Sequence, residues 1–209
     1  MDTSLSIDHY LEELSSSAPT PGGGNVSAFC GVLAASLGIM VCNLTIGKKK
    51  YTDSEEELKL LKVKLESTKN EFLMLSEEDN KAFDLVMEAF KMPKETDTEK
   101  SMRSKKIEEM TIGAGIVPHR VISLCKEVLP MLMVIAEKGN QNSLSDAGVA
   151  LSLISTAAQG AFLNVLINCT SYKENQQAKD ILVKSETEFT EAKKLCDSGL
   201  ELIEKKLGR

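Results

Sequence analysis

An aspartate lies on the apolar seam of one predicted helix, a position from which a carboxylate can do acid–base chemistry. Between residues 54 and 91, apolar residues recur every seven positions, at Leu65, Phe72 and Val86 among others. Asp79 occupies the position of this seam between Phe72 and Val86. Burial disfavours the charged form of a carboxylate and raises its pKa towards the range that suits a general acid or base at neutral pH. We predict Asp79 as the catalytic residue; the alternatives are a register shifted by one residue or a salt bridge to a neighbouring helix.

Further polar side chains lie at the start of a helix or inside apolar stretches. Asp146 falls in the first turn of a predicted helix, where a carboxylate either has a function or only stabilises the positive end of the helix dipole. Asn43, Asn164 and Asn168 lie within apolar segments. A buried amide must be hydrogen-bonded, so these asparagines predict a polar cavity or a network between helices.

Both ends of the charge-free stretch from residue 19 to 47 suit an anionic ligand. The start holds a proline and a glycine run: Pro21, Gly22, Gly23 and Gly24. The end is followed by a cationic run: Lys48, Lys49 and Lys50. Glycines at a helix N-terminus let backbone N–H groups approach a ligand, and lysines can hold its negative charge. The plain alternatives are a tight turn and the stabilisation of a helix C-terminus by positive charge.

The composition indicates that helices position these residues. Aromatic residues make up 4% of the chain, Trp is absent, and no period-2 alternation persists beyond a few residues. We predict an all-α, single-domain helical bundle over residues 1–209, kinked at Pro118. The expected helices cover residues 7–14, 25–45, 54–91, 96–138, a fifth that is capped by residue 143 or 145, and 175–207.

Two of the expected helices contain no charged side chain and many small ones. The helix over residues 25–45 includes Gly31, Ala34 and Gly38, and residues 147–172 likewise lack charge. The first is long enough to span a bilayer, but polar and tiny side chains interrupt it. We therefore predict two central helices of the bundle, packed on every side by their neighbours.

Charge and cysteine content narrow the class of protein. The net charge is -6 and no basic stripe recurs along the chain, which disfavours nucleic acid as a partner. The acidic N-terminus lacks the pattern of a signal peptide. Five scattered cysteines without a CxxC pair indicate reduced core residues, and the chain has two histidines. We expect a cytoplasmic protein with no metal site and no membrane association.

Four ordered segments carry a resemblance to a known family. They are SSAPTPGGGNVSA, MVCNLTIGKKKY, DNKAFDLVMEAFKMPK and AEKGNQNSLSDAGVA, the last followed by NVLIN. In order and spacing they resemble the cyclodeaminase/cyclohydrolase family of folate enzymes, over residues 5–168. That family includes stand-alone bacterial methenyltetrahydrofolate cyclohydrolases and the cyclodeaminase domain of formimidoyltransferase-cyclodeaminase.

The resemblance implies a homodimeric all-α fold and a folate substrate, with tetrahydrofolate as the substrate carrier and no further cofactor. It favours hydrolysis of 5,10-methenyltetrahydrofolate to 10-formyltetrahydrofolate, with Asp79 as the proton shuttle. Asp146, the second catalytic candidate, would orient the folate ring or the water together with Asn43 and Asn164. The glycine turn would approach the ligand, and the three lysines would meet its carboxylates.

Two other functions stay open from the sequence. One is the cyclodeamination of 5-formiminotetrahydrofolate, in which N10 attacks the formimino carbon and ammonia leaves. The other is a non-catalytic helical partner that keeps the fold without the activity, which the intact Asp79 and Asn43 disfavour. In the segment VPHR, Pro118 matches the family pattern whereas His119 and Arg120 do not. We therefore leave His119 out of the mechanism.

Overall fold

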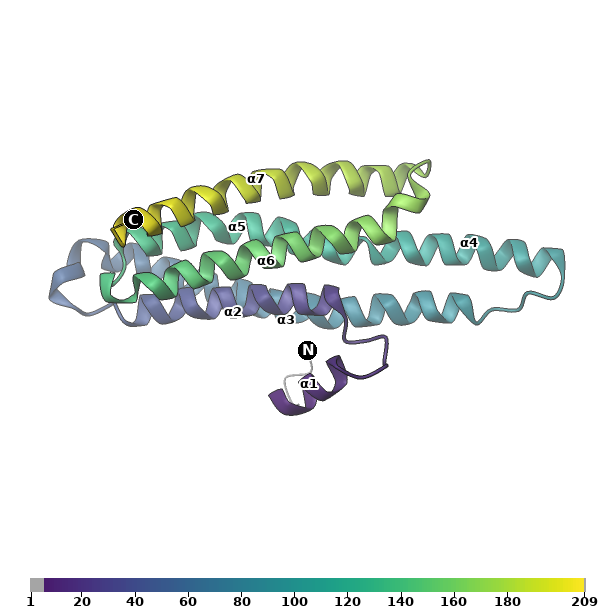
Figure 1. The fold of residues 1–209 in the computed structure, drawn as a ribbon, viewed down its shortest axis with the longest axis horizontal. Coiled ribbons are helices and arrows are strands. Elements are labelled where there is room, and N and C mark those ends of the chain that lie inside the picture. Colours follow the sequence, from purple (N-terminus) through teal and green to yellow (C-terminus); the bar gives the residue numbers. More distant parts are fainter. Residues whose placement is uncertain (1–5, 209) are drawn as a thin grey trace.

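The chain folds into an all-α bundle (Figure 1). This computed structural model describes residues 6–208, so the predicted domain limits at residues 1 and 209 lie outside the described part. Within residues 6–208 there are helices and no strand, which confirms the predicted fold class. The α-helices are α1 (Ile7–Leu14), α2 (Gly23–Asn43), α3 (Glu55–Phe90), α4 (Asp97–Ala114), α5 (Ile116–Lys138), α6 (Leu144–Cys169) and α7 (Gln176–Lys206), and short 3-10 helices cover Lys49–Ser54, Gln141–Ser143 and Thr170–Tyr172.

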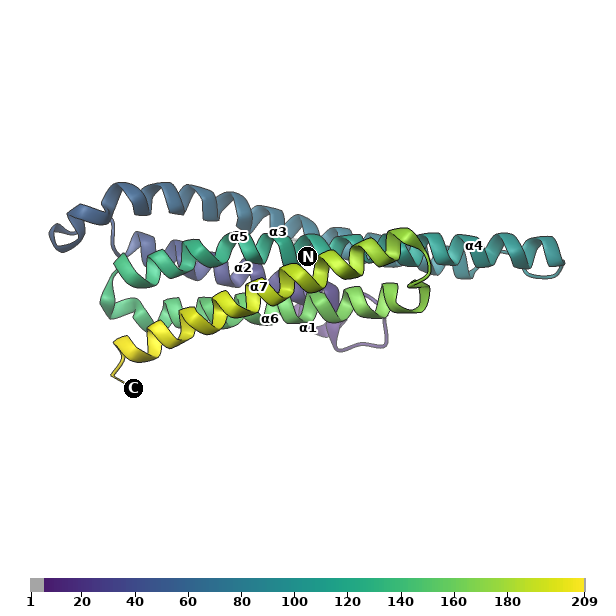
Figure 2. The ribbon, with the colours of Figure 1, turned by 90° about the horizontal axis from the view of Figure 1, so that it is seen from above.

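The long helices run lengthwise beside one another (Figures 1 and 2). α2 packs against α3 and α6, and α6 packs in turn against α5 and α7. The C-terminal half of α3 pairs with α4, and this pair extends beyond the other helices at one end of the molecule. The short α1 lies outside the bundle and reaches the start of α2 through Tyr10. The start of α2, the middle of α3 and the end of α6 therefore meet in one region.

Small residues let α2 approach its neighbours closely. A Cβ atom added at Gly31 would lie 2.5 Å from the ring of Phe72. One added at Gly38 would lie 2.7 Å from Leu132 and 2.8 Å from Leu65. All three of these neighbours are buried side chains from α3 and α5. A larger residue at either glycine would push the helices apart, so the small residues are a packing requirement of α2.

The prediction that the two charge-free helices are packed on every side is wrong for one face. The neighbouring helices of the chain cover the other sides of α2 and α6 and leave one side of each exposed. We call this surface the α2–α6 face; it comprises the half-buried Met40 and the exposed residues Leu33, Ser36, Asn43, Leu44, Val149, Ser152, Thr156, Gln159, Leu163 and Ile167. It carries no charge, and Ile167 is 76% exposed. Burial within one chain therefore does not explain why these helices lack charge.

Both charge-free helices are long and apolar enough to cross a membrane by length and composition. The helical segments concerned are Gly23–Asn43 and Gln141–Tyr172, and 56% and 39% of their most apolar windows are buried inside the bundle. Apolar core helices of soluble proteins satisfy the same criterion. The incomplete burial leaves the α2–α6 face available for a partner.

The interruption expected at Pro118 lies three residues earlier, at Gly115, between α4 and α5. In an unbroken helix the N–H of residue 118 would bond to the carbonyl of Ala114, and proline has no N–H to donate. The Ala114 carbonyl instead accepts a hydrogen bond from the Asn168 side chain at 3.2 Å. Pro118 itself fits in the first turn of α5, where the first N–H groups have no partner within the helix.

Candidate active site

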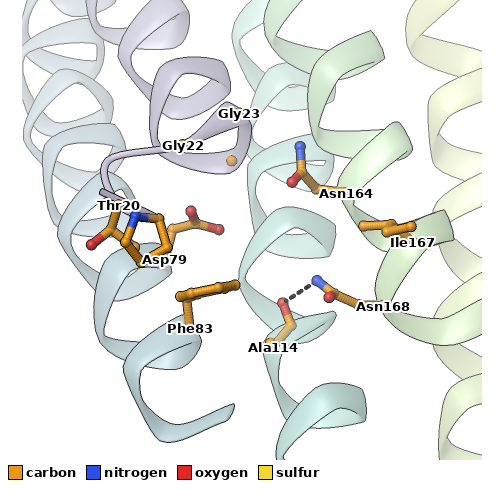
Figure 3. A pocket seen from close by; sticks show the side chains of 11 residues that line it. Thr20, Gly22, Gly23, Asp79, Phe83, Ala114, Asn164, Ile167 and Asn168 are labelled. Atoms are coloured by element: carbon orange, nitrogen blue, oxygen red, sulfur yellow. Dashed lines mark hydrogen bonds between the residues drawn. The ribbon is translucent and has the colours of Figure 1, made fainter. Parts of the chain in front are cut away.

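A cavity of about 220 Å³ opens where the start of α2 meets α3, α4 and α6 (Figure 3). Its lining residues are Pro19, Thr20, Gly22, Gly23, Gly24, Asp79, Phe83, Ala114, Asn164, Ile167 and Asn168. Phe83 and Ile167 give it apolar walls, and a carboxylate and two amides give it polar ones. The structure thus brings together the glycine turn, Asp79 and Asn164, which were predicted separately from the sequence.

Asp79 lies directly against the first turn of α2. The N-cap residue Gly22 has no side chain that accepts a hydrogen bond from the helix start. The carboxylate of Asp79 takes that place, because it accepts a hydrogen bond from the backbone N–H of Asn25. A Cβ atom at Gly24 would overlap the carboxylate. A glycine at position 24 is therefore what allows α3 to bring Asp79 to the N-terminus of α2.

Burial raises the pKa of Asp79 to about 6, while the hydrogen bond from the Asn25 backbone acts in the opposite direction. A carboxyl group with that pKa holds appreciable amounts of both protonation states near neutral pH. Among the described residues, no other ionisable side chain lines the cavity. Asp79 is therefore the group in this cavity that can take up a proton and return it.

Two asparagines of α6 form the wall opposite Asp79 (Figure 3). The Asn164 amide donates to the carbonyl of Gly160 at 2.8 Å, and the Asn168 amide donates to the carbonyl of Ala114 at 3.2 Å. Asn164 also lies against Gly23, since a Cβ atom there would be 3.5 Å from its amide nitrogen. The polar cavity predicted from the asparagines is confirmed for these two residues.

The other predicted site residues lie at the opposite end of the α2–α6 face. Asn43 is exposed at the end of α2, about 30 Å along the helix from Gly23. Asp146 lies in the first turn of α6, about 27 Å along that helix from Asn164. The exposed residues Lys48, Lys49 and Lys50 follow the same end of α2. We call Asn43, Asp146 and these lysines the distal group; within one chain it does not reach the cavity.

Pro21 differs from the rest of its turn. It is buried between Thr20 and Gly22, both of which line the cavity, but it is not itself part of the lining. In this chain, Pro21 therefore supports the structure of the turn.

The model of the Formiminotransferase-cyclodeaminase family matches residues 6–187. The chain belongs to this family. The match includes every wall of the cavity, and it confirms the resemblance that the four sequence segments carried.

Several relatives of the formiminotransferase-cyclodeaminase family extend this comparison. The chain is 40% identical over 201 residues to a methenyltetrahydrofolate cyclohydrolase of Methylorubrum extorquens, covering 96% of this chain and 97% of that protein. It is 32% identical to the formimidoyltransferase-cyclodeaminase of Mus musculus, covering 80% of this chain and 31% of that longer protein. A crystal structure of formiminotetrahydrofolate cyclodeaminase from Thermotoga maritima superposes with a TM-score of 0.85, at 28% identity and 96% coverage of both chains.

Some lining residues were not predicted from the sequence. Phe83 follows Asp79 by four residues on α3, and that helical spacing is a signal that could have found it. Ala114 and Ile167 carry no such signal, because alanine and isoleucine are common in the apolar positions of any helix. Asn25 was also missed, although a fully buried amide beside the glycine turn is a strong polar feature.

Among the described residues, no histidine or cysteine lines the cavity. Within residues 6–208, no group of three or more His, Cys, Asp and Glu side chains is arranged to hold a metal ion. The five cysteines are free, and four of them are buried. Nδ1 of His119 lies 3.0 Å from the hydroxyl of Ser185, between α5 and α7, and His119 is outside the lining.

Proposed function

We propose that this chain hydrolyses 5,10-methenyltetrahydrofolate to 10-formyltetrahydrofolate in the cavity at Asp79. The observation that carries the proposal is a carboxyl group with a pKa of about 6 at the N-terminus of α2. The relative from Methylorubrum extorquens, which is covered almost end to end, is named a methenyltetrahydrofolate cyclohydrolase. That similarity favours this reaction over the other reaction of the family.

Asp79 supplies the proton transfers in this proposal. The methenyl carbon bridges N5 and N10 and is electrophilic, so water adds to it while the Asp79 carboxylate takes one proton from the water. The tetrahedral carbon then loses its bond to N5, Asp79 returns its proton to N5, and the hydroxyl proton leaves to solvent as the formyl group forms. General acid–base catalysis of this kind contributes about 10² to 10⁴ in rate, or roughly 3 to 5 kcal/mol.

Other lining residues bind and orient the substrate. The amide of Asn164 faces Asp79 across the cavity and can hydrogen-bond the folate ring or the attacking water. The backbone of Gly22, Gly23 and Gly24 brings the positive end of α2 to the same place. The ring of Phe83 offers an apolar surface for a planar ligand. No cofactor takes part in this proposal, since tetrahydrofolate is the carrier of the substrate.

Cyclodeamination of 5-formiminotetrahydrofolate is the second candidate. The structural relative from Thermotoga maritima, with a TM-score of 0.85, is a formiminotetrahydrofolate cyclodeaminase. In that reaction N10 attacks the formimino carbon, and the nitrogen that leaves as ammonia needs a proton. Asp79 can supply this proton from the same cavity, so the two candidates differ in the leaving group and share the proton shuttle.

We also propose that two copies of the chain pair through the α2–α6 face. The face is long and free of charge, six of its eleven residues are apolar, and a partner of the same composition would bury it without leaving a charge unpaired. A protein partner accounts for the absence of charge without a membrane. We therefore propose a cytoplasmic homodimer that binds neither membrane nor nucleic acid. The net charge of -6 agrees with the absence of nucleic-acid binding.

An antiparallel pairing would give the distal group a role. It would bring the end of α2 in one copy, with Asn43 and Lys48–Lys50, against the start of α2 in the other copy. The lysines would then meet the carboxylates of a folate bound at Asp79 of the partner. Within one chain, Asn43 and the lysines that follow it lie at least about 30 Å along α2 from Gly23.

The test supplies purified protein with 5,10-methenyl- and 5-formiminotetrahydrofolate separately. Loss of methenyl absorbance reports hydrolysis, and ammonia release reports cyclodeamination. The proposal expects the first reaction, with Asp79→Asn slowed by at least about 10². Ammonia release without methenyl hydrolysis would establish the second candidate. A chain that neither binds nor turns over either folate would be the non-catalytic helical partner.

A further inference from the structure

Tyr10 is the buried residue of α1 and connects this helix to the bundle. It is 5% exposed, whereas Ile7 and Leu11 of the same helix are 66% and 53% exposed. Its ring lies 5.6 Å from that of Phe29 in α2, and its hydroxyl donates a hydrogen bond of 2.8 Å to the side-chain oxygen of Asn25. The contact of α1 with α2 is therefore made through a polar group as well as a ring.

Asn25 connects Tyr10 to α3, the helix that carries Asp79. The side chain of Asn25 is completely buried, and its amide donates to the backbone carbonyl of Ser76 at 2.8 Å. Its backbone N–H donates to the carboxylate of Asp79. Ser76 and Asp79 are three residues apart and lie on the same side of α3. Asn25 thus holds the first turn of α2 against the turn of α3 that carries the carboxylate.

We propose that Tyr10 is a positioning residue for Asp79: its hydroxyl fixes Asn25 so that the Asn25 backbone N–H stays directed at the carboxylate. The inference deepens the proposed function and rests on it, because Asp79 is the proton shuttle of that proposal. Without the hydroxyl, the buried oxygen of Asn25 loses the donor that Tyr10 supplies, and the residue must shift to find another. The N–H bond to Asp79 then lengthens, and the charged form of Asp79 loses part of its stabilisation.

The residues around Asp79 allow its titration to be measured without contributions from other ionising groups in the cavity. The turn before α2, the start of α2, the end of α4 and the lining part of α6 contribute uncharged residues to the cavity. On α3, the neighbouring Glu78 is paired with Arg120 of α5. Burial raises the pKa of Tyr10 above its ordinary value of 10.0, so this tyrosine stays neutral when Asp79 titrates.

The test follows the Asp79 carboxyl by NMR of ¹³C-labelled protein across pH, in the wild type and in two variants. Tyr10→Phe removes the hydroxyl and keeps the ring that packs on Phe29. Ser185→Ala is the matched control, because it removes a fully buried hydroxyl that bonds across α7 and α5 to His119, away from the cavity. Circular dichroism and thermal unfolding of each protein report its folding.

The proposal expects Asp79 to titrate near pH 6 in the wild type and in Ser185→Ala. In Tyr10→Phe its proton affinity should rise about threefold to tenfold, and kcat for methenyl hydrolysis should fall with little change in KM. An unchanged Asp79 titration in a Tyr10→Phe protein that has only lost thermal stability would overturn the positioning role. A shifted titration in a chain that turns over neither folate would support the positioning role and refute the proposed function.

Discussion

At the residue scale, the central feature is a carboxylate of α3 that caps the N-terminus of α2. Asp79 accepts from the backbone of Asn25 and occupies the space that a side chain at Gly24 would need. The helix end favours the negative charge, but burial outweighs it and leaves the pKa raised to about 6. The carboxyl group of Asp79 can therefore exchange a proton near neutral pH, and its buried charge lowers the stability of the folded protein.

That cost predicts that Asp79→Asn stabilises the protein at neutral pH. The folded pKa of about 6 exceeds the unfolded value near 3.8, so the folded state binds more protons between these values and stability falls as pH rises through them. An asparagine can still accept from the Asn25 N–H and carries no charge to desolvate. We expect a gain of roughly 1 to 3 kcal/mol at pH 7, measured by urea unfolding.

The same comparison at pH 4 is the control for the Asp79→Asn prediction. Most of the folded protein then has a neutral Asp79, so the gain should shrink towards zero. A gain of equal size at pH 4 and pH 7 would show that it does not come from the ionised carboxylate.

Gly23 and Gly24 give a matched pair of substitutions in the first turn of α2. In Gly24→Ala the new methyl group overlaps the Asp79 carboxylate and must displace it, so methenyl hydrolysis should fall at least about a hundredfold. In Gly23→Ala the nearest atom is the Asn164 amide at 3.5 Å, an ordinary contact, so the protein should fold with up to about 1 kcal/mol of added stability. Equal losses of activity in both variants would contradict the role given to the glycine at position 24.

Much of this residue-scale geometry was predictable, and part was not. The heptad seam placed Asp79 towards the bundle interior, and the glycine turn was a separate signal. Their contact joins positions 55 residues apart. Helical periodicity predicts which side of each helix faces the bundle interior, but it does not predict how far one helix is shifted along its axis relative to another. For the same reason helical periodicity could not reveal that Asn43 and Asp146 lie far from Asp79.

At the element scale, the glycines of α2 determine how closely the helices pack. Gly31→Ala would place a methyl group 2.5 Å from the ring of Phe72, which is fully buried and has no room to turn aside. We expect this variant to lose about 1 to 3 kcal/mol of stability through overpacking. Gly113→Ala is the matched control, because a Cβ atom at that helical position in α4 meets nothing within 4 Å.

Gly113→Ala should gain up to about 1 kcal/mol from helix propensity. Urea unfolding of both variants measures the difference between a packed and an unpacked helical glycine. If Gly31→Ala is as stable as the wild type, the close approach of α2 to α3 is not a requirement of the fold.

The limits of most elements followed from local chemistry. Ser6 caps α1, the Thr96–Glu99 capping box opens α4, and Asn175 caps α7. The burial of α2 and α6 was harder to predict. A charge-free helix has the same sequence pattern whether its own chain or a second copy covers it, so periodicity could not reveal the exposed α2–α6 face.

At the scale of the whole molecule, the α2–α6 face predicts a dimer that a charge on the face should break. Leu33 and Leu163 are 41% and 56% exposed on it. We expect the wild type to be a dimer and the double variant Leu33→Glu, Leu163→Glu to be a folded monomer by light scattering after size exclusion, because a dimer would bury both carboxylates. Leu60→Glu, at a 68% exposed position of α3, should stay dimeric.

A wild-type monomer at micromolar concentration would contradict the proposed pairing. Mixing Asp79→Asn with a variant in which Lys48, Lys49 and Lys50 are alanine tests the antiparallel arrangement. Each mixed dimer would contain one cavity with both Asp79 and the partner's lysines intact. Recovery of activity above that of either parent supports the arrangement, and no recovery argues against it.

The pH dependence of methenyltetrahydrofolate hydrolysis tests the central claim most directly. For the wild type, kcat should decline as pH falls through about 6, because protonation removes the carboxylate form of Asp79 that accepts the proton from water. In Asp79→Asn this acidic limb should vanish, and kcat should be about 10² to 10⁴ lower across the range. Wild-type and Asp79→Asn proteins that hydrolyse the methenyl compound equally fast, with the same pH profile, would contradict the account.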